Sequence, residues 1–151
     1  MKKKYYSWND LEKASGYIVG QMYQDSWRPT YLVGITRGGL PLAVMISHLA
    51  NIPMFTAKVS KRDGNTVQID PQIHKDVRLG ADILIVDDIN DSGNTFQIIW
   101  DELGLDNIEP GSVRFAAMTE NISSEFGHVS YHWDEVNKAE NDTWLVYPYE
   151  V

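Results

Sequence analysis

The amino-acid sequence predicts an α/β fold in which helices flank a mostly parallel central sheet. Short apolar runs, which are typical of buried strands, alternate with segments whose apolar residues recur at helical spacing. Strands that alternate with helices usually pair in parallel, so we expect helices on both faces of the sheet. The chain has 151 residues, 43% hydrophobic and 23% charged, which fits one folded domain over residues 1–151.

The predicted elements follow from apolar spacing and from the residues that bound them. Ser7 followed by Asp10 is a weaker form of the capping box and marks the start of the first helix. Pro41 fits the first turn of the second helix, where its missing N–H is not needed. The basic residues 1–4 are expected to be a solvated tail. In chain order we expect a helix at 7–23, a strand at 31–35, a helix at 40–49, strands at 54–59 and 82–88, a helix at 95–103, and strands at 113–119 and 144–147.

Residues 60–80 interrupt this alternation with a long polar segment. We expect either a mobile loop or a hairpin whose turn is Asp63-Gly64-Asn65. A loop of this length in a compact domain is often functional, so we expect a flap over a site.

Charge and composition exclude several classes of function. The chain has 13 Lys and Arg against 21 Asp and Glu, a net charge of −8, which argues against general nucleic-acid binding. It contains no cysteine, which excludes disulfides and thiolate zinc sites. No segment approaches the ~20 apolar residues of a membrane span, and we expect a cytoplasmic protein.

The most informative segment runs from Ile83 to Thr95. Its apolar start delivers Asp87 and Asp88 to the carboxyl end of a predicted strand, the edge where open α/β sheets bind ligands. A polar turn then leads into a helix, whose first N–H groups and dipole favour a phosphate. Ser92 adds a hydroxyl to the same place, and the two acids suit ribose hydroxyls and hydrated Mg²⁺.

This segment resembles the 5-phosphoribosyl-1-pyrophosphate (PRPP) signature of the type I phosphoribosyltransferases. The loop Thr36-Arg37-Gly38-Gly39, which follows a predicted strand, is similar to the pyrophosphate loop of that family. The opening Tyr5-x-x-Trp8 and the ending at 142–150 (DTWLVYPYE) look like the small microbial xanthine-guanine and hypoxanthine phosphoribosyltransferases. The resemblance implies the type I phosphoribosyltransferase fold, with a flexible loop at about 60–80 and a small hood from the N-terminus and about 120–151.

The resemblance also implies an activity. The protein would move ribose 5-phosphate from PRPP to a nucleobase, with hypoxanthine, guanine or xanthine as expected acceptors, and would use Mg²⁺. A homodimer or homotetramer is expected, as is a cis peptide at Thr36–Arg37. The resemblance also implies a role for each matching residue. Pyrophosphate would be bound by Thr36, Arg37, Gly38 and Gly39, and the ribose hydroxyls and the metal by Asp87 and Asp88. The 5-phosphate would be bound by Asp91, Ser92, Gly93, Asn94 and Thr95, the base would be bound by Trp144, Leu145 and Asn121, and Asp91 would accept the proton of the base.

The chain departs from the family pattern in a minor way at Asn90 and in a more serious way after the strand at 113–119, and the second departure leaves the acceptor base open. Relatives that act on 6-oxopurines have a Lys-Pro after the strand at 113–119, whereas this chain has Glu120-Asn121-Ile122. A carboxylate cannot donate a hydrogen bond to a purine oxygen, although the Asn121 amide could. Asn90 stands where the family usually has an apolar residue.

The sequence is also compatible with other interpretations. The acceptor could be a different base, or the protein could bind PRPP as a regulator without catalysis. Trp144 could be a core aromatic residue instead of a base platform. Lys58, Lys61 and Arg62 lie near the place where relatives hold a cation for pyrophosphate, but Lys61 and Arg62 could equally be solvated surface.

Overall fold

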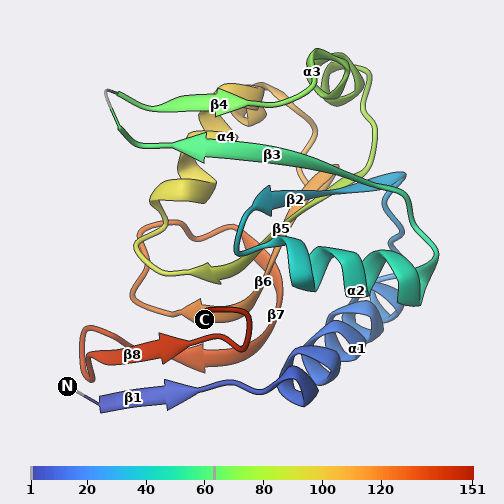
Figure 1. The fold of residues 1–151 in the computed structure, drawn as a ribbon. Helices are drawn as coiled ribbons and strands as arrows, with labels where there is room; N and C mark the ends of the chain where they lie inside the picture. The colour runs from blue at the N-terminus through green and yellow to red at the C-terminus, as the bar shows by residue number, and fades with distance from the viewer. Residues whose placement is uncertain (1, 63) are drawn as a thin grey trace.

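Six strands form the central sheet in the order β4-β3-β2-β5-β6-β7, and all neighbours are parallel except β3 and β4 (Figure 1). This computed structural model describes residues 2–62 and 64–151. The prediction of a mostly parallel sheet is confirmed. The strands are β2 (Tyr31–Thr36), β3 (Met54–Ser60), β4 (Thr66–Gln68), β5 (Ile83–Asn90), β6 (Val113–Asn121) and β7 (Val129–Val136).

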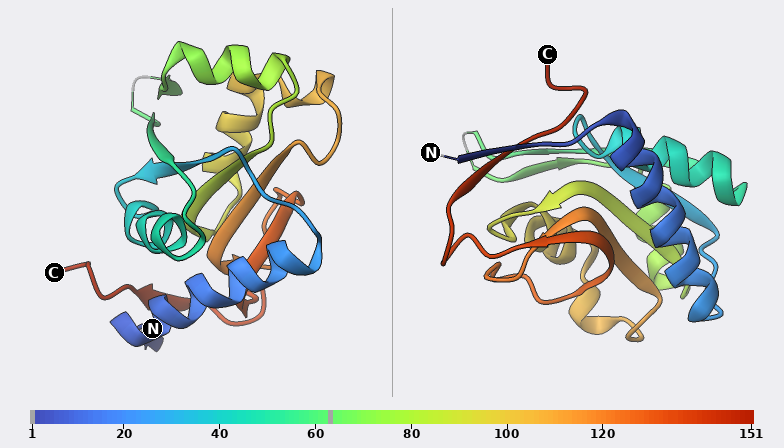
Figure 2. Two further views of the ribbon diagram at one scale, coloured as in Figure 1. Left: turned by 90° about the vertical axis from the view of Figure 1, so that its right-hand side faces the viewer. Right: turned by 90° about the horizontal axis from the view of Figure 1, so that it is seen from below.

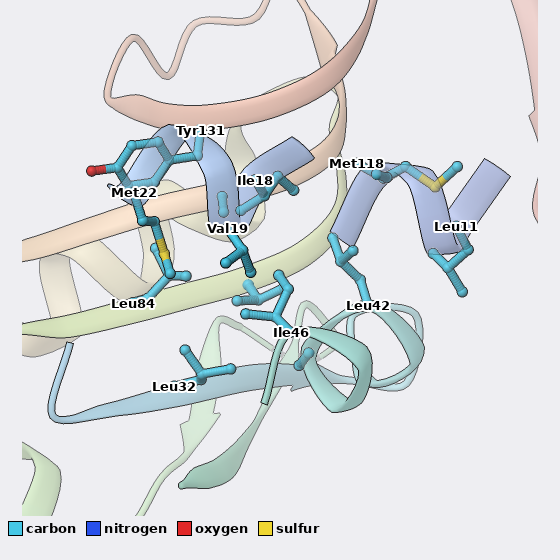
Figure 3. Packing of buried hydrophobic residues seen from close by; sticks show 14 of the residues in the cluster. Leu11, Ile18, Val19, Met22, Leu32, Leu42, Ile46, Leu84, Met118 and Tyr131 are labelled. Atoms are coloured by element: carbon cyan, nitrogen blue, oxygen red, sulfur yellow. The ribbon is translucent and has the colours of Figure 1, made fainter. Parts of the chain in front are cut away.

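Helices cover both faces of the sheet, as predicted. α1 (Trp8–Gln24) and α2 (Leu40–Ala50) lie on one face, and α3 (Pro71–Arg78) and α4 (Asn94–Leu103) lie on the other (Figure 2). A short 3₁₀ turn, η1 (Leu105–Asn107), follows α4. Each face has its own hydrophobic core, because alternate side chains of a strand point to opposite faces. Figure 3 shows the first core, where α1 and α2 side chains pack onto residues of the strands.

The predicted capping box starts α1. The Ser7 hydroxyl accepts from the Asp10 backbone N–H at 3.0 Å, and the Asp10 carboxylate accepts from the Ser7 N–H at 2.9 Å. Two of the N–H groups that the helix start would leave unpaired are therefore satisfied. Among the described residues, no helix is both long enough and apolar enough to span a bilayer.

Two strands of the structure were not predicted from the sequence. The expected solvated tail is wrong for β1 (Lys2–Tyr5), which pairs in parallel with β8 (Thr143–Val146) in a separate two-stranded sheet. All four side chains of β1 are exposed, so no apolar alternation marks it in the sequence. β7 was also missed, although its first six residues, Val-Ser-Tyr-His-Trp-Asp, alternate apolar and polar side chains as a half-buried strand does.

The segment at 60–80 is more ordered than a loop. β3 and β4 form the antiparallel hairpin that was one of the two expectations, although Asp63 of the predicted turn lies outside the described residues. The expectation of a loop is wrong for 71–78, which form α3. Asp70 caps this helix by accepting from the Gln72 N–H at 2.9 Å, and Pro71 occupies its first turn. The Asp-Pro pair was the available signal for this helix start.

A chain of hydroxyl groups fastens the two-stranded sheet to the main one. The Tyr147 hydroxyl donates to Thr119 Oγ1 at 3.0 Å, Thr119 donates to the Tyr6 hydroxyl at 3.0 Å, and Tyr6 donates to Asp134 Oδ2 at 2.7 Å. Lys4 Nζ donates to the same carboxylate oxygen. Burial raises the pKa of Asp134, but the hydrogen bonds from Lys4 and Tyr6 outweigh it and hold that pKa below its usual range.

We expect Asp134→Asn to lower the Tm at pH 7 by about 2–4 °C, the shift that a loss of ~1 kcal/mol produces in a domain of this size. The folded-state pKa of Asp134 is depressed, so its stabilisation is present above the unfolded value of about 3.9 and is lost as pH falls through the folded value. Thermal unfolding of both proteins from pH 7 to pH 3 measures this, and the two Tm values should converge at the acid end. Glu12→Gln, on the exposed side of α1, is the control; a pH-independent difference for Asp134→Asn would contradict the ion-pair account.

Candidate active site

The loops that follow β2 and β5 meet at one edge of the sheet, because these two strands are parallel neighbours. The first loop has a cis peptide at Thr36–Arg37, as expected. A Cβ at Gly38 would collide with the Asp88 carboxylate, and one at Gly39 would lie 2.5 Å from the Val86 carbonyl oxygen. The loop backbone therefore lies directly against the end of β5, which only glycine permits.

The paired acids lie in a partly desolvated position at this edge. Asp87 is 9% exposed, and its Oδ1 accepts from the Asp88 backbone N–H at 2.8 Å. The Tyr149 hydroxyl donates to Asp88 Oδ2 at 3.1 Å. Burial, together with the charge of Asp88, raises the pKa of Asp87 well above its usual range, and burial likewise raises the pKa of Asp88. The site therefore favours a ligand that brings positive charge or hydroxyl donors to these carboxylates.

The turn after β5 forms a cradle at the start of α4. Gly93 caps the helix with φ +93°, and a Cβ there would lie 2.6 Å from the Phe126 backbone nitrogen, so both conformation and space require glycine. The Asn94 N–H donates to Ser92 Oγ at 3.2 Å. The next N–H groups at the start of α4 have no partner within the helix and face the turn with the positive end of its dipole. This arrangement suits an oxyanion such as a phosphate.

Two hollows border the turn. One of about 260 Å³ is lined by residues 87–96 and by Lys61. Of the three candidate loop cations, Lys61 is thus the one that the structure brings to this hollow, and its positive charge partly offsets the rise in the pKa of Asp87. The other, about 690 Å³, lies beside Asp91 and Asn94 and extends to Gln97 and Asn121.

The two departures from the family pattern form one hydrogen-bonded pair. Asn90 and Glu120 are register partners on β5 and β6, and Asn90 Nδ2 donates to Glu120 Oε1 at 2.7 Å. Asn90 is 2% exposed and also donates to the Phe126 carbonyl at 3.2 Å. Burial raises the pKa of Glu120, while the Asn90 hydrogen bond lowers it. The carboxylate of Glu120 is therefore engaged within the sheet.

Asn121 is also engaged within the protein. It is 5% exposed, its Nδ2 donates to the Asp91 carbonyl at 2.8 Å, and its Oδ1 accepts from the Ser123 hydroxyl at 2.8 Å and from the Lys138 N–H at 3.0 Å. The amide that sequence analysis assigned to the base thus supports the Asp91 turn in this structure.

Lys138 was not singled out from the sequence. Its Nζ donates to Asp91 Oδ2 at 3.0 Å across 47 residues of chain. It lies in the polar connection between β7 and β8, where it belongs to no local pattern, so only the folded structure brings it to the site.

Trp144 and Leu145 lie on β8 with opposite exposure. Trp144 is 53% exposed, so the alternative of a core aromatic residue is wrong, and its ring is free to take a flat ligand. Leu145 is 7% exposed and belongs to the first core. The register pairs Lys3 with Trp144, so β1 supports the strand that carries the ring.

The donor set at the acids fits Mg²⁺ in its usual mode. Magnesium is commonly held by one or two carboxylates, with waters and substrate phosphates completing an octahedron. Asp87 and Asp88 supply two such carboxylates, and neither forms a salt bridge within the described residues. Among the residues that the structure describes, no group of three or more His, Cys, Asp or Glu side chains is placed to hold a metal ion. His128 and His132 are four residues apart, but His128 stacks on Trp100 and His132 contacts Glu135.

Comparisons with known proteins agree with this geometry. The chain is 26% identical over 150 residues to the xanthine-guanine phosphoribosyltransferase of Idiomarina loihiensis, covering 96% of this chain and 85% of that protein. It is 32% identical over 114 residues to the hypoxanthine phosphoribosyltransferase of Salmonella typhimurium, covering 72% and 63%. The solved purine phosphoribosyltransferase of Pyrococcus horikoshii matches with a TM-score of 0.74 at 20% identity, covering 100% of this chain and 95% of that one, which confirms the fold.

A mostly parallel sheet with a glycine-rich loop, paired acids and a helix-start cradle at one edge is an α/β architecture whose geometry suits a phosphorylated ligand. The family model described as phosphoribosyl transferase domain matches residues 1–150. The chain therefore belongs to the phosphoribosyl transferase domain family.

Gly39→Ala should destabilise the protein by about 1–3 kcal/mol, because its Cβ would press on backbone carbonyls that cannot move aside. Gly16→Ala is the matched control: it lies inside α1, a Cβ there meets nothing within 4 Å, and we expect a gain of about 0.5–1 kcal/mol. Denaturant unfolding measures both. An unchanged midpoint for Gly39→Ala would mean that the loop is not held against β5.

Proposed function

We propose that the protein is a purine phosphoribosyltransferase, which transfers ribose 5-phosphate from PRPP to a purine base and releases pyrophosphate. The observation that carries the proposal is the meeting of the cradle at 91–95, the acids Asp87 and Asp88, and the loop at 36–39 at one sheet edge. The names of the relatives from Idiomarina loihiensis and Salmonella typhimurium support the purine acceptor.

In this proposal, each part of PRPP has its own protein partners. The 5-phosphate lies on the α4 start with Asp91, Ser92, Gly93, Asn94 and Thr95. The pyrophosphate lies against the 36–39 loop, where Arg37 offers its forked donors and Gly38 and Gly39 offer close backbone approach. Lys61 adds a cation from the loop side of the hollow. Asp87 and Asp88 accept from the ribose hydroxyls and would hold Mg²⁺, which when bound supplies positive charge against the pyrophosphate.

The reaction breaks the bond between ribose C1 and the pyrophosphate oxygen, whose electron pair leaves with pyrophosphate. A ring nitrogen of the base forms the new bond to C1, and the proton carried by the ring passes to the Asp91 carboxylate. Arg37 and the loop N–H groups stabilise the charge that grows on the leaving group. Trp144 stacks on the base and the backbone groups of Leu145 meet its edge, which holds the ring nitrogen in line with C1.

The surrounding elements complete the proposal. The β3–β4 hairpin closes over the site and excludes water, which would otherwise compete with the base for the ribosyl group. The hood is built from β1, β8 and the connection from β7, which carry the base-side residues. Homodimer or homotetramer formation remains a prediction.

The test is pyrophosphate release from PRPP and Mg²⁺ with hypoxanthine, guanine, xanthine, adenine, uracil and orotate. We expect release with a purine, and a loss of about 10²–10⁴ in kcat for Asp91→Asn, because general base catalysis contributes that factor. Asp101→Asn, an exposed change on α4, is the matched control and should keep full rate. Both variants should still bind PRPP, which is measured as the increase in the Tm of the protein when PRPP is added.

The remaining outcomes separate the alternatives. Release with uracil or orotate alone would mean a different acceptor. Shifts in Tm by PRPP without release from any base would contradict the enzyme and favour the regulatory protein. Full activity in Asp91→Asn would remove this residue from the proton transfer.

A further inference from the structure

The lysine beside Asp91 comes from the hood and reaches the site as an oriented group. Lys138 lies in the connection between β7 and β8, six positions before Trp144. Its Nζ donates to Asp91 Oδ2 at 3.0 Å, with side-chain exposures of 21% for Lys138 and 49% for Asp91. A side chain so largely covered has a more defined direction than an ordinary surface lysine, whose ion pairs contribute little.

Asn121 holds both partners of this pair by their backbones. Its Oδ1 accepts from the Lys138 N–H at 3.0 Å and its Nδ2 donates to the Asp91 carbonyl at 2.8 Å. The three residues thus form a closed ring of hydrogen bonds in which the amide of Asn121 is 5% exposed. The ring sets the ammonium and the carboxylate side by side, although they belong to distant parts of the chain.

The end of β6 offers the base no alternative donor with positive charge. Glu120 accepts from Asn90 at 2.7 Å, and Asn121 is engaged in the ring just described. Ile122, the next residue, is 57% exposed and apolar. Lys138 is therefore the cation that this structure sets against the Asp91 carboxylate.

An ammonium next to a carboxylate matches one edge of a purine that carries an exocyclic oxygen. In such purines the six-position oxygen lies beside ring nitrogen N7, so the edge pairs an acceptor with a ring N–H in the free base. The carboxylate of Asp91 can accept from the ring N–H while Lys138 donates to the oxygen. A lysine ammonium has three donors, so one can remain on Asp91. An amino group at the six position would instead direct its own N–H at the ammonium.

We propose that Lys138 is a specificity-determining residue that donates to the exocyclic oxygen of the base and so selects 6-oxopurines over 6-aminopurines. This inference rests on the proposed function and names the subclass of its substrate.

The kinetic test compares Lys138→Met with the native protein at saturating PRPP, using hypoxanthine and adenine. We expect the KM for hypoxanthine to rise about 10- to 100-fold, with a matching loss in the preference for hypoxanthine over adenine in kcat/KM. The KM for PRPP, measured at saturating hypoxanthine, should change less than about twofold, because the proposed contact of Lys138 is with the base and not with PRPP. Lys13→Met, on the exposed side of α1, is the control and should change nothing. A fall in kcat that is equal for both bases would overturn the proposal and make Lys138 a positioning residue for Asp91; an unchanged preference would also overturn it.

A binding test separates this inference from the proposed function. Inosine 5-phosphate and adenosine 5-phosphate carry the two contrasting groups at the six position, and their binding needs no turnover. By calorimetry, the native protein should bind the inosine nucleotide at least about tenfold more tightly, and Lys138→Met should lose that difference. Equal binding of both nucleotides by the native protein overturns the inference even if transferase activity is found. If no base supports turnover but this difference is present and depends on Lys138, the proposed function fails and the recognition of the base stands.

If Lys138→Met does not fold, Lys138→Gln provides the same test, since it keeps a donor but removes the charge. It should keep part of the preference for the oxygen-bearing nucleotide, and a wild-type preference in Lys138→Gln would contradict a role for the ammonium.

Discussion

The contact between the glycine loop and the end of β5 is the constraint on which the site depends. Gly39 leaves no room for a side chain between its backbone and the carbonyls of Val86 and Ile35, and Gly38 lies against the Asp88 carboxylate. Parallel pairing of β2 with β5 sets the two loops side by side, and the missing side chains let them touch. One set of backbone positions thereby fixes the loop at 36–39, the acids Asp87 and Asp88, and the turn at 91–95 relative to one another.

The sequence was informative where local chemistry and packing agree. Buried strands such as β5 and the capped start of α1 follow from apolar spacing and end residues, and they lie where these patterns predict. β1 could not be found this way, because its four side chains are exposed and hydrogen bonds to a strand from the other end of the chain define it. α3 was hidden by the polar composition around it, although Asp70-Pro71 marks its start.

The residues of the site also divide into those that local sequence patterns predict and those that only the folded structure brings together. The phosphate and acid residues lie in continuous motifs, so their proximity was predictable from two segments. Lys138 reaches the site across a long stretch of chain, and no local pattern distinguishes it. Tyr149 lies in the family-like ending at 142–150, but nothing in that pattern indicated its hydrogen bond to Asp88. In the sequence, Glu120 counted against recognition of a purine oxygen, and Asn121 was expected to contact the base. In the fold, Glu120 is the partner of Asn90 and Asn121 joins Asp91 to Lys138, so residues that looked like substitutions in a binding site act as internal supports.

The pairing of β1 with β8 has a consequence for the order in which the site matures. The register joins Lys2 to Thr143, so the hood closes a contact between nearly the most distant described positions of the chain. Such pairings form late, since loop closure costs entropy before the contact stabilises anything. On a ribosome, the sheet and the phosphate cradle emerge before β8. The two-stranded sheet that carries Trp144 is therefore completed only after the segments that form the central sheet and the turn at 91–95 are available.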